Sequence, residues 1–247
     1  MPLAAPGAAA GQPRPFDWNG FDLVVFDVDG TLYDQRRLRL AMLRQLLASA
    51  WRSRSLDTVR TLRTFRHVRE ALGDQPVDDF MAAQYARTAD RHGKTPDQVR
   101  VLATDWLEQR PLPLLGACRF PYVDAVFRGL KAMGKQIAVF SDYPAAAKLA
   151  ALGLQASPIV CATDPDIGRL KPDPTGLLAV LQRTCIEASR ALMIGDRIDR
   201  DAAVAQRAGM RSLIRTAKAS LGGGTFRGYD DPVFQPLLER AGSAVTG

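Results

Sequence analysis

The sequence predicts an α/β protein, in which a parallel sheet has helices on both faces and an all-helical segment is inserted after the first strand. Three observations predict this fold. Short apolar runs alternate with helical patterns through the second half of the chain. The first apolar run, residues 23–26, ends in an acidic turn. More than a hundred residues then separate it from the second run, and their pattern is helical throughout.

The expected strands are short apolar runs, and the run at 23–26 is apolar at all four positions. Such a run is typical of a parallel strand that is buried on both faces. Helical patterns connect the later runs, and strand–helix–strand units form right-handed crossovers. We expect strands at 23–26, 136–140, 158–162, 191–194 and 211–214, and core helices at 123–133, 145–152, 175–181 and 202–208.

The long interval after the first strand exceeds one crossover helix and predicts an insertion over the carboxyl edge of the sheet. Thr95, Pro96 and Gln98 give a strong start signal, because they match an N-cap, a first helical proline and a capping box. Apolar residues recur every three positions from Leu56 to Val68, and this spacing winds around a helix of about 3.6 residues per turn, so we expect contacts on several sides. The expected helices are 38–51, 56–72, 77–92 and 96–108.

These patterns divide the chain into three parts. Residues 1–15 are mainly Ala, Gly and Pro without apolar periodicity, a composition typical of a flexible segment. We therefore predict a tail at 1–17, a sheet-forming core at 18–35 and 118–247, and a helical domain at 36–117.

Composition limits the cellular setting. No apolar stretch approaches the roughly 20 residues of a membrane-spanning helix, so we expect a soluble, unexported, cytoplasmic protein with no membrane insertion. Cys118, Cys161 and Cys185 lack metal-binding or paired spacing, and we expect small core residues in a reducing compartment. The net charge of +7 indicates an anionic partner.

The residues that follow the predicted strands carry the chemistry. Asp27 and Asp29 follow the first strand, where two carboxylates can share one pocket at the carboxyl edge of the sheet. Each later polar residue alone has an ordinary structural explanation as a turn hydroxyl, a solvated lysine or a helix-terminal acid. Their common placement at strand ends favours a functional site. The later residues are Ser141 and Asp142, Lys171, Asp196, and Asp199 with Asp201.

In these residues the chain resembles the haloacid dehalogenase-like hydrolase superfamily. Asp-Val-Asp-Gly-Thr at 27–31 is similar to its first motif, Ser141 to its second, Lys171 to its third, and Asp196 with Asp201 to its fourth. The resemblance implies a Rossmann-like, three-layer core with a helical cap. It also implies Mg²⁺-dependent hydrolysis of phosphate monoesters.

The resemblance assigns a role to each position. Asp27 would attack phosphorus and form an aspartyl-phosphate, and Asp29 would protonate the leaving oxygen and then activate water. Because carboxylate and phosphate repel each other, Mg²⁺ would lie between them. Its ligands would be Asp27, Asp196 and the backbone carbonyl of Asp29. The remaining assignments are Lys171, Ser141, Gly30 and Asp142 for the phosphate, and Asp201, above Asp199, for orienting metal-bound water or the lysine.

The second motif departs from the family pattern, because Asp142 stands where related sequences often have Asn. This places additional negative charge near the expected phosphate. The acid at Asp29 favours phosphate chemistry over dehalogenation, since a halide needs no proton to leave.

The expected substrate is a small phosphorylated metabolite. Ten arginines and one carboxylate, Asp57, lie between residues 36 and 69. Arg36, Arg37 and Arg39 follow the first motif closely and are candidates for contacting a second anionic group. A phosphomutase using the same chemistry is an alternative, and a basic nucleic-acid-binding protein is a weaker one, because no nucleic-acid motif is present. The substrate and the oligomeric state stay open.

Overall fold

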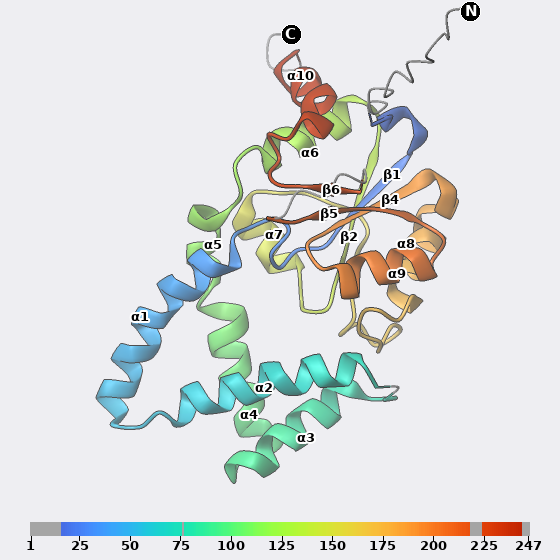
Figure 1. The fold of residues 1–247 in the computed structure, drawn as a ribbon. Helices are drawn as coiled ribbons and strands as arrows, with labels where there is room; N and C mark the ends of the chain where they lie inside the picture. Colours follow the sequence, from blue (N-terminus) through green and yellow to red (C-terminus); the bar gives the residue numbers. More distant parts are fainter. Residues whose placement is uncertain (1–15, 76, 218–223, 244–247) are drawn as a thin grey trace, which may run out of the picture.

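The computed structural model describes residues 16–75, 77–217 and 224–243. Its centre is a six-stranded parallel sheet with the order β3-β2-β1-β4-β5-β6 (Figure 1). The strands carry the predicted apolar runs at nearly the predicted positions, which confirms the α/β class. Their bounds are β1 Leu23–Phe26, β2 Gln136–Ser141, β3 Ile159–Cys161, β4 Ala191–Gly195, β5 Arg211–Arg215 and β6 Thr225–Phe226.

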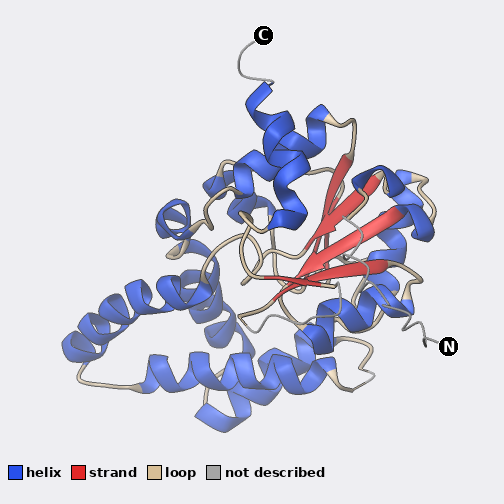
Figure 2. Ribbon diagram, turned by 45° about the horizontal axis from the view of Figure 1, so that its top comes forward, coloured by secondary structure: helices blue, strands red, loops and turns tan. Residues whose placement is uncertain are grey.

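Strand β1 lies inside the sheet and is buried on both faces. Val24 and Phe26 belong to one hydrophobic cluster, and Leu23 and Val25 belong to another. Since successive strand residues point to opposite faces, the two clusters are the two interlayer cores of a three-layer domain. One core includes side chains of α6, α7 and α10, and the other includes side chains of α8 and α9. Figure 2 shows helices on both sides of the sheet. These helices are α6 Val123–Ala132, α7 Ala146–Leu152, α8 Thr175–Thr184, α9 Ala203–Arg207 and α10 Gln235–Ser243.

The helical insertion follows β1 directly. Two long helices, α1 and α2, extend as arms that meet at one end, and α3 and α4 pack beside α2 (Figures 1 and 2). The predicted capping box is present, because Thr95 and Gln98 bond reciprocally at the start of α4. The helices are α1 Gln35–Ser53, α2 Asp57–Gly73, α3 Phe80–His92, α4 Pro96–Ala103, a π-helical turn Thr104–Gln109 and α5 Leu112–Cys118.

The three-residue apolar repeat of α2 behaves as expected. Leu62 packs into a core cluster, Phe65 packs with α3 and α4, and Val68 packs with Phe80 and Leu170. The repeat thus joins three clusters instead of one stripe, and its last part reaches the loop after β3.

Several expectations need correction. Residues 1–15 of the predicted tail lie outside the described residues, whereas Phe16 stacks on Phe21 and thus belongs with the core. Cys185 is exposed at the end of α8, while the other two cysteines are buried. Helices α5 and α10 and strand β6 extend the predicted element set. The expected boundaries at 36 and 117 fall within α1 and α5.

Among the described residues, no helix combines the length and the apolar character needed to cross a membrane.

Candidate active site

The candidate site lies where β1, β2 and β4 end side by side. Asp27 follows β1, Ser141 ends β2, and Asp196 follows β4. The parallel register places these ends at one edge, since Phe26 lies beside both Val139 and Ile194. Lys171, in the loop after β3, completes the group with an ammonium that bonds to Asp27.

Lys171 lies at the centre of the buried charges. Its Nζ donates to Asp27 Oδ1 at 2.7 Å and to Asp201 Oδ1 at 2.8 Å, and its side chain is only 2% exposed. Burial opposes the charge, but Asp201, Asp27 and Asp142 outweigh it and raise the pKa of Lys171. The lysine therefore stays an ammonium, as a residue that neutralises a phosphate must.

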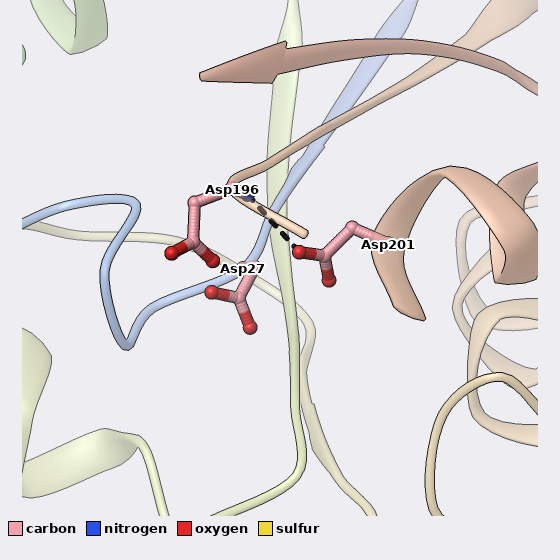
Figure 3. A group of neighbouring side chains, drawn as sticks. All are labelled: Asp27, Asp196 and Asp201. Carbon is pink, nitrogen blue, oxygen red and sulfur yellow. Dashed lines mark hydrogen bonds between the residues drawn. The ribbon is translucent and has the colours of Figure 1, made fainter. Parts of the chain in front are cut away.

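Asp27, Asp196 and Asp201 form an acidic cluster, with one carboxylate oxygen of each within 4.8 Å of the others (Figure 3). Burial and the neighbouring acids raise the pKa of Asp27 well above its usual range, although Lys171 opposes this. Burial and Asp201 likewise raise the pKa of Asp196 to about 6. Three carboxylates beside one ammonium give the cluster a net negative charge, which a bound cation would neutralise.

The donor set of this cluster fits Mg²⁺. Asp196 Oδ1 is buried and has no hydrogen-bond partner among the described residues. Each oxygen of Asp27 accepts one hydrogen bond, Oδ1 from Lys171 and Oδ2 from the Thr31 hydroxyl at 3.0 Å, and each keeps a second lone pair for a cation. Hard carboxylate oxygens are the ligands that Mg²⁺ prefers.

Gly30 makes the close approach of Asp196 possible. It has a φ of +95°, and a Cβ at this position would lie 2.2 Å from Asp196 Oδ2. Only glycine fits both the backbone conformation and the space. Gly30 therefore shapes the acidic cluster, in addition to its predicted proximity to a phosphate.

Asp201 is anchored more strongly than its neighbours. Its Oδ2 accepts the backbone amides of Asp196 and Arg197, both at 3.0 Å, while its Oδ1 accepts from Lys171. Asp199 is exposed and pairs with Arg197. Asp201 can thus orient both Lys171 and the loop that carries Asp196.

Asp29 lies outside the acidic cluster, although it is only two residues from Asp27. Lys148 Nζ donates to both of its oxygens at 2.6 Å, and the Tyr33 hydroxyl donates to Oδ1. Burial raises the pKa of Asp29, but these two partners outweigh it and hold the pKa below the usual range. Asp29 therefore rests as a carboxylate beside the cluster.

The loop after β2 supports the lysine and not an anion directly. Asp142 Oδ1 accepts the backbone amide of Lys171 at 2.9 Å, and burial raises the pKa of this carboxyl. A carboxylate offers no donor to a phosphate, so a contact of Asp142 with phosphate would use its backbone amide, and the predicted phosphate-binding role of Asp142 stays a prediction. Ser141 is 1% exposed, and its Oγ accepts the backbone amide of Tyr143 at 3.2 Å, leaving its proton available.

A cavity of about 910 Å³ joins this edge to the helical insertion. Its wall includes Asp27, Asp29 and Lys171 from the core and apolar residues of α1 and α2. Of the three arginine candidates, the wall includes Arg36 and Arg39 but, among the described residues, not Arg37. Further arginines of α2 line it: Arg63, Arg66 and Arg69.

The insertion is joined to the site loops by buried arginines. Arg69 of α2 donates to Gln84 at 2.9 Å and to the carbonyl of Asp142, and it lies 4.1 Å from the centre of the Tyr143 ring. Arg200, beside Asp201, donates to the carbonyl of Lys171 at 3.0 Å and pairs with Asp74 at 2.8 Å. Each arginine therefore spans from a loop of the core to the insertion.

The sequence model of the haloacid dehalogenase-like hydrolases matches residues 21–209. The chain belongs to the haloacid dehalogenase-like hydrolase family. The phosphoglycolate phosphatase of Rhodospirillum rubrum is 34% identical over 209 residues, which cover 81% of this chain and 83% of that protein.

Two solved structures share the fold of this haloacid dehalogenase-like hydrolase. A 2-haloacid dehalogenase from Pseudomonas syringae pv. Tomato has a TM-score of 0.58 and 22% identity, covering 91% of this chain and 99% of that one. A β-phosphoglucomutase from Clostridium difficile has a TM-score of 0.57 and 16% identity, covering 92% and 100%. Since the names of these proteins state different reactions, the fold alone does not select one.

In this haloacid dehalogenase-like hydrolase, the structure brings together most of the predicted residues and adds others. The sequence prediction missed Lys148, Arg69 and Arg200. Lys148 had one signal, because it is the only charged residue from 144 to 154. The two arginines had none, since they lie among many other arginines.

Proposed function

We propose that this chain is a Mg²⁺-dependent phosphatase that hydrolyses a small phosphorylated metabolite through an aspartyl-phosphate at Asp27. Its broader class, a hydrolase of phosphoric monoesters, agrees with its family and with its phosphatase relative. The observation that carries the proposal is the buried Asp27 carboxylate, 2.7 Å from Lys171 and beside Asp196. A nucleophile, a fixed cation and a metal-type carboxylate thus meet at one point.

The first half-reaction uses Asp27 and Asp29. A carboxylate oxygen of Asp27 attacks phosphorus, and the bond from phosphorus to the ester oxygen breaks. Asp29 rests as a carboxylate, so it first takes up a proton from the bound phosphate monoanion, and it then passes this proton to the leaving oxygen, which departs as an alcohol. Bound at Asp27 and Asp196, Mg²⁺ would supply charge neutralisation between nucleophile and phosphate.

The second half-reaction returns Asp27 to its starting state. Asp29, which gave up its proton, takes one from a water molecule as the water attacks phosphorus. The acyl phosphate bond breaks, and inorganic phosphate and the Asp27 carboxylate result. Lys171 and the Ser141 hydroxyl hold the equatorial oxygens through both steps, where fixed donors stabilise developing charge.

The helical insertion acts as the cap. It supplies one wall of the cavity, and its α1 begins at Gln35, shortly after the nucleophile. Arg36 and Arg39 line this wall and remain candidates for a second anionic group, together with Arg63 and Arg66. The cytoplasmic location is part of the proposal and is supported by three unpaired cysteines.

The described residues favour hydrolysis over the two alternatives. The β-phosphoglucomutase is 16% identical to this chain, so the likeness concerns the fold and does not indicate the reaction. The arginine-rich segment is partly engaged inside the molecule, because Arg69 is buried and Arg63 and Arg66 line the cavity. Most arginines of α1 and α2 are nevertheless exposed, so a steeply salt-dependent binding of nucleic acid would support that alternative.

The test is phosphate release from p-nitrophenyl phosphate with and without Mg²⁺. The wild-type protein should require Mg²⁺, and Asp27→Asn should abolish turnover while keeping the wild-type melting temperature within a few degrees. A matched control is Asp199→Asn, which changes an exposed acid of the same edge and should leave turnover near wild type. Turnover by Asp27→Asn at the wild-type rate would refute the mechanism.

A further inference from the structure

Asp29 is held by side chains from two other parts of the chain. Lys148 of α7 bonds to both carboxylate oxygens, and Tyr33 bonds from the segment before α1. Lys148 is 7% exposed, and its ammonium lies 5.3 Å from the centre of the Tyr143 ring. Both oxygens of Asp29 are therefore fixed in direction.

This arrangement separates two acids that are adjacent on the strand end. Asp27 is bonded to Lys171 and Thr31, while Asp29 is bonded to Lys148 and Tyr33. Asp29 thus has the ammonium of Lys148, whereas Asp27 shares the ammonium of Lys171 with Asp201, and each of the two acids also accepts from one hydroxyl. Both acids line the same cavity, so the two ammonium groups hold them at two distinct positions of one wall.

A purely structural ion pair accounts poorly for Lys148. Helix α7 is already anchored by the buried Leu149 and Leu152, and its other residues are small or apolar. Burying a lysine has a desolvation cost that a packed apolar side chain would avoid. A charged residue at this one position is therefore better explained by what it does to Asp29.

We propose that Lys148 is a positioning residue that holds Asp29 for proton transfer to the leaving oxygen. This inference rests on the proposed function, in which Asp29 is the acid and base. In this role Lys148 acts through Asp29 and needs no contact with the phosphate. It fixes the carboxylate so that one oxygen faces the departing group, and proton transfer depends steeply on such geometry.

The leaving group provides the test. Phenyl phosphate and p-nitrophenyl phosphate have similar shapes, but phenolate is the more basic and needs a proton more. With Mg²⁺ present, Lys148→Met should lower kcat on phenyl phosphate about 100-fold and on p-nitrophenyl phosphate less than about 10-fold. KM should change little on either ester.

Two further variants sharpen this result. Lys131→Met changes a surface lysine that donates to Gln155 at 3.2 Å, and it should leave both rates unchanged. In an Asp29→Asn background, Lys148→Met should cause no further loss, because residues acting through one group are not additive. If Lys148→Met fails to fold, Lys148→Gln should show the same dependence on the leaving group.

An equal loss on both esters, or an additive loss in the Asp29→Asn background, would overturn the role of Lys148. The proposed function fails by a different result, which is full turnover by Asp27→Asn. The two failures are therefore distinguishable in the same assay.

Discussion

The sheet edge and the helical insertion line the same cavity, but the charged side chains of the edge are bonded to one another and those of the insertion are mostly exposed. At the sheet edge, Asp27, Asp29, Asp201 and Lys171 have named partners within 3 Å. In the insertion, most arginines of α1 and α2 are exposed. The charged groups of the edge are thus fixed by hydrogen bonds to one another, whereas most arginines of the insertion are in contact with solvent.

Removing the ammonium of Lys171 should have the largest effect on activity, because it removes the cation at the centre of the sheet edge. Lys171→Met leaves Asp27 and Asp201 without their shared ammonium, so we expect kcat to fall about 100-fold to 1,000-fold. The free energy of unfolding should fall by about 3 kcal/mol or more, since a buried acid loses its partner. Steady-state kinetics and urea unfolding with Mg²⁺ measure the two effects. Wild-type kcat in this variant would contradict the importance of the edge.

Crowding the acidic cluster should have the next largest effect. Gly30→Ala places a methyl group 2.2 Å from Asp196 Oδ2 at a φ of +95°. We expect a loss of about 1–3 kcal/mol in stability from backbone strain alone. The apparent Mg²⁺ affinity in the activity assay should also weaken, because Asp196 must move. Gly93→Ala, at a positive φ with open space, is the control for strain without crowding.

The attachment of the helical insertion to the sheet edge is tested by removing the side chain of Arg69. Arg69→Met removes hydrogen bonds to Gln84 and to the carbonyl of Asp142, and we expect a loss of about 2 kcal/mol from the unpaired buried groups. Arg60→Met, at an exposed position of the same helix, should change stability by less than about 0.5 kcal/mol. Thermal unfolding of both variants makes the comparison. Equal losses of stability in the two variants would show that Arg69 does not attach α2 to the sheet edge.

The smallest expected effect is the pH dependence of metal stabilisation. In the metal-free protein the pKa of Asp196 is raised from 3.8 to about 6, so the folded state binds a proton more readily than the unfolded state. Stability from this group is full below about pH 4 and is lost as the pH rises through about 6. The rise in melting temperature caused by Mg²⁺ should therefore be larger at pH 7.5 than at pH 5. An opposite order would contradict the assignment of the cluster as the metal site.

Residues at strand ends were predictable because two simple rules place them. An apolar run marks a strand, and parallel strands bring their ends to one edge. Asp27, Ser141 and Asp196 follow from these rules, and Lys171 from its place after the next strand. Lys148 does not, because its approach to Asp29 depends on how α7 packs on the sheet.

The missed elements have similar physical reasons. Strand β6 is two residues long, too short for any apolar alternation. Helix α5 begins with two prolines nearby, Pro111 and Pro113, which obscure its start although proline fits a first turn. The anchors Arg69 and Arg200 gain their roles from tertiary contacts alone, so no local pattern marks them among the other arginines.

The position of β1 also affects how the chain folds. Leu23 pairs with Gln136 and with Ala191, so β1 finds its neighbours only after long stretches of chain have been made. Its four apolar residues and the two acids that follow leave the ribosome well before β2 and β4. Such distant pairing slows folding and leaves a hydrophobic strand open to association. The insertion that builds the cavity therefore delays burial of the strand that carries the nucleophile.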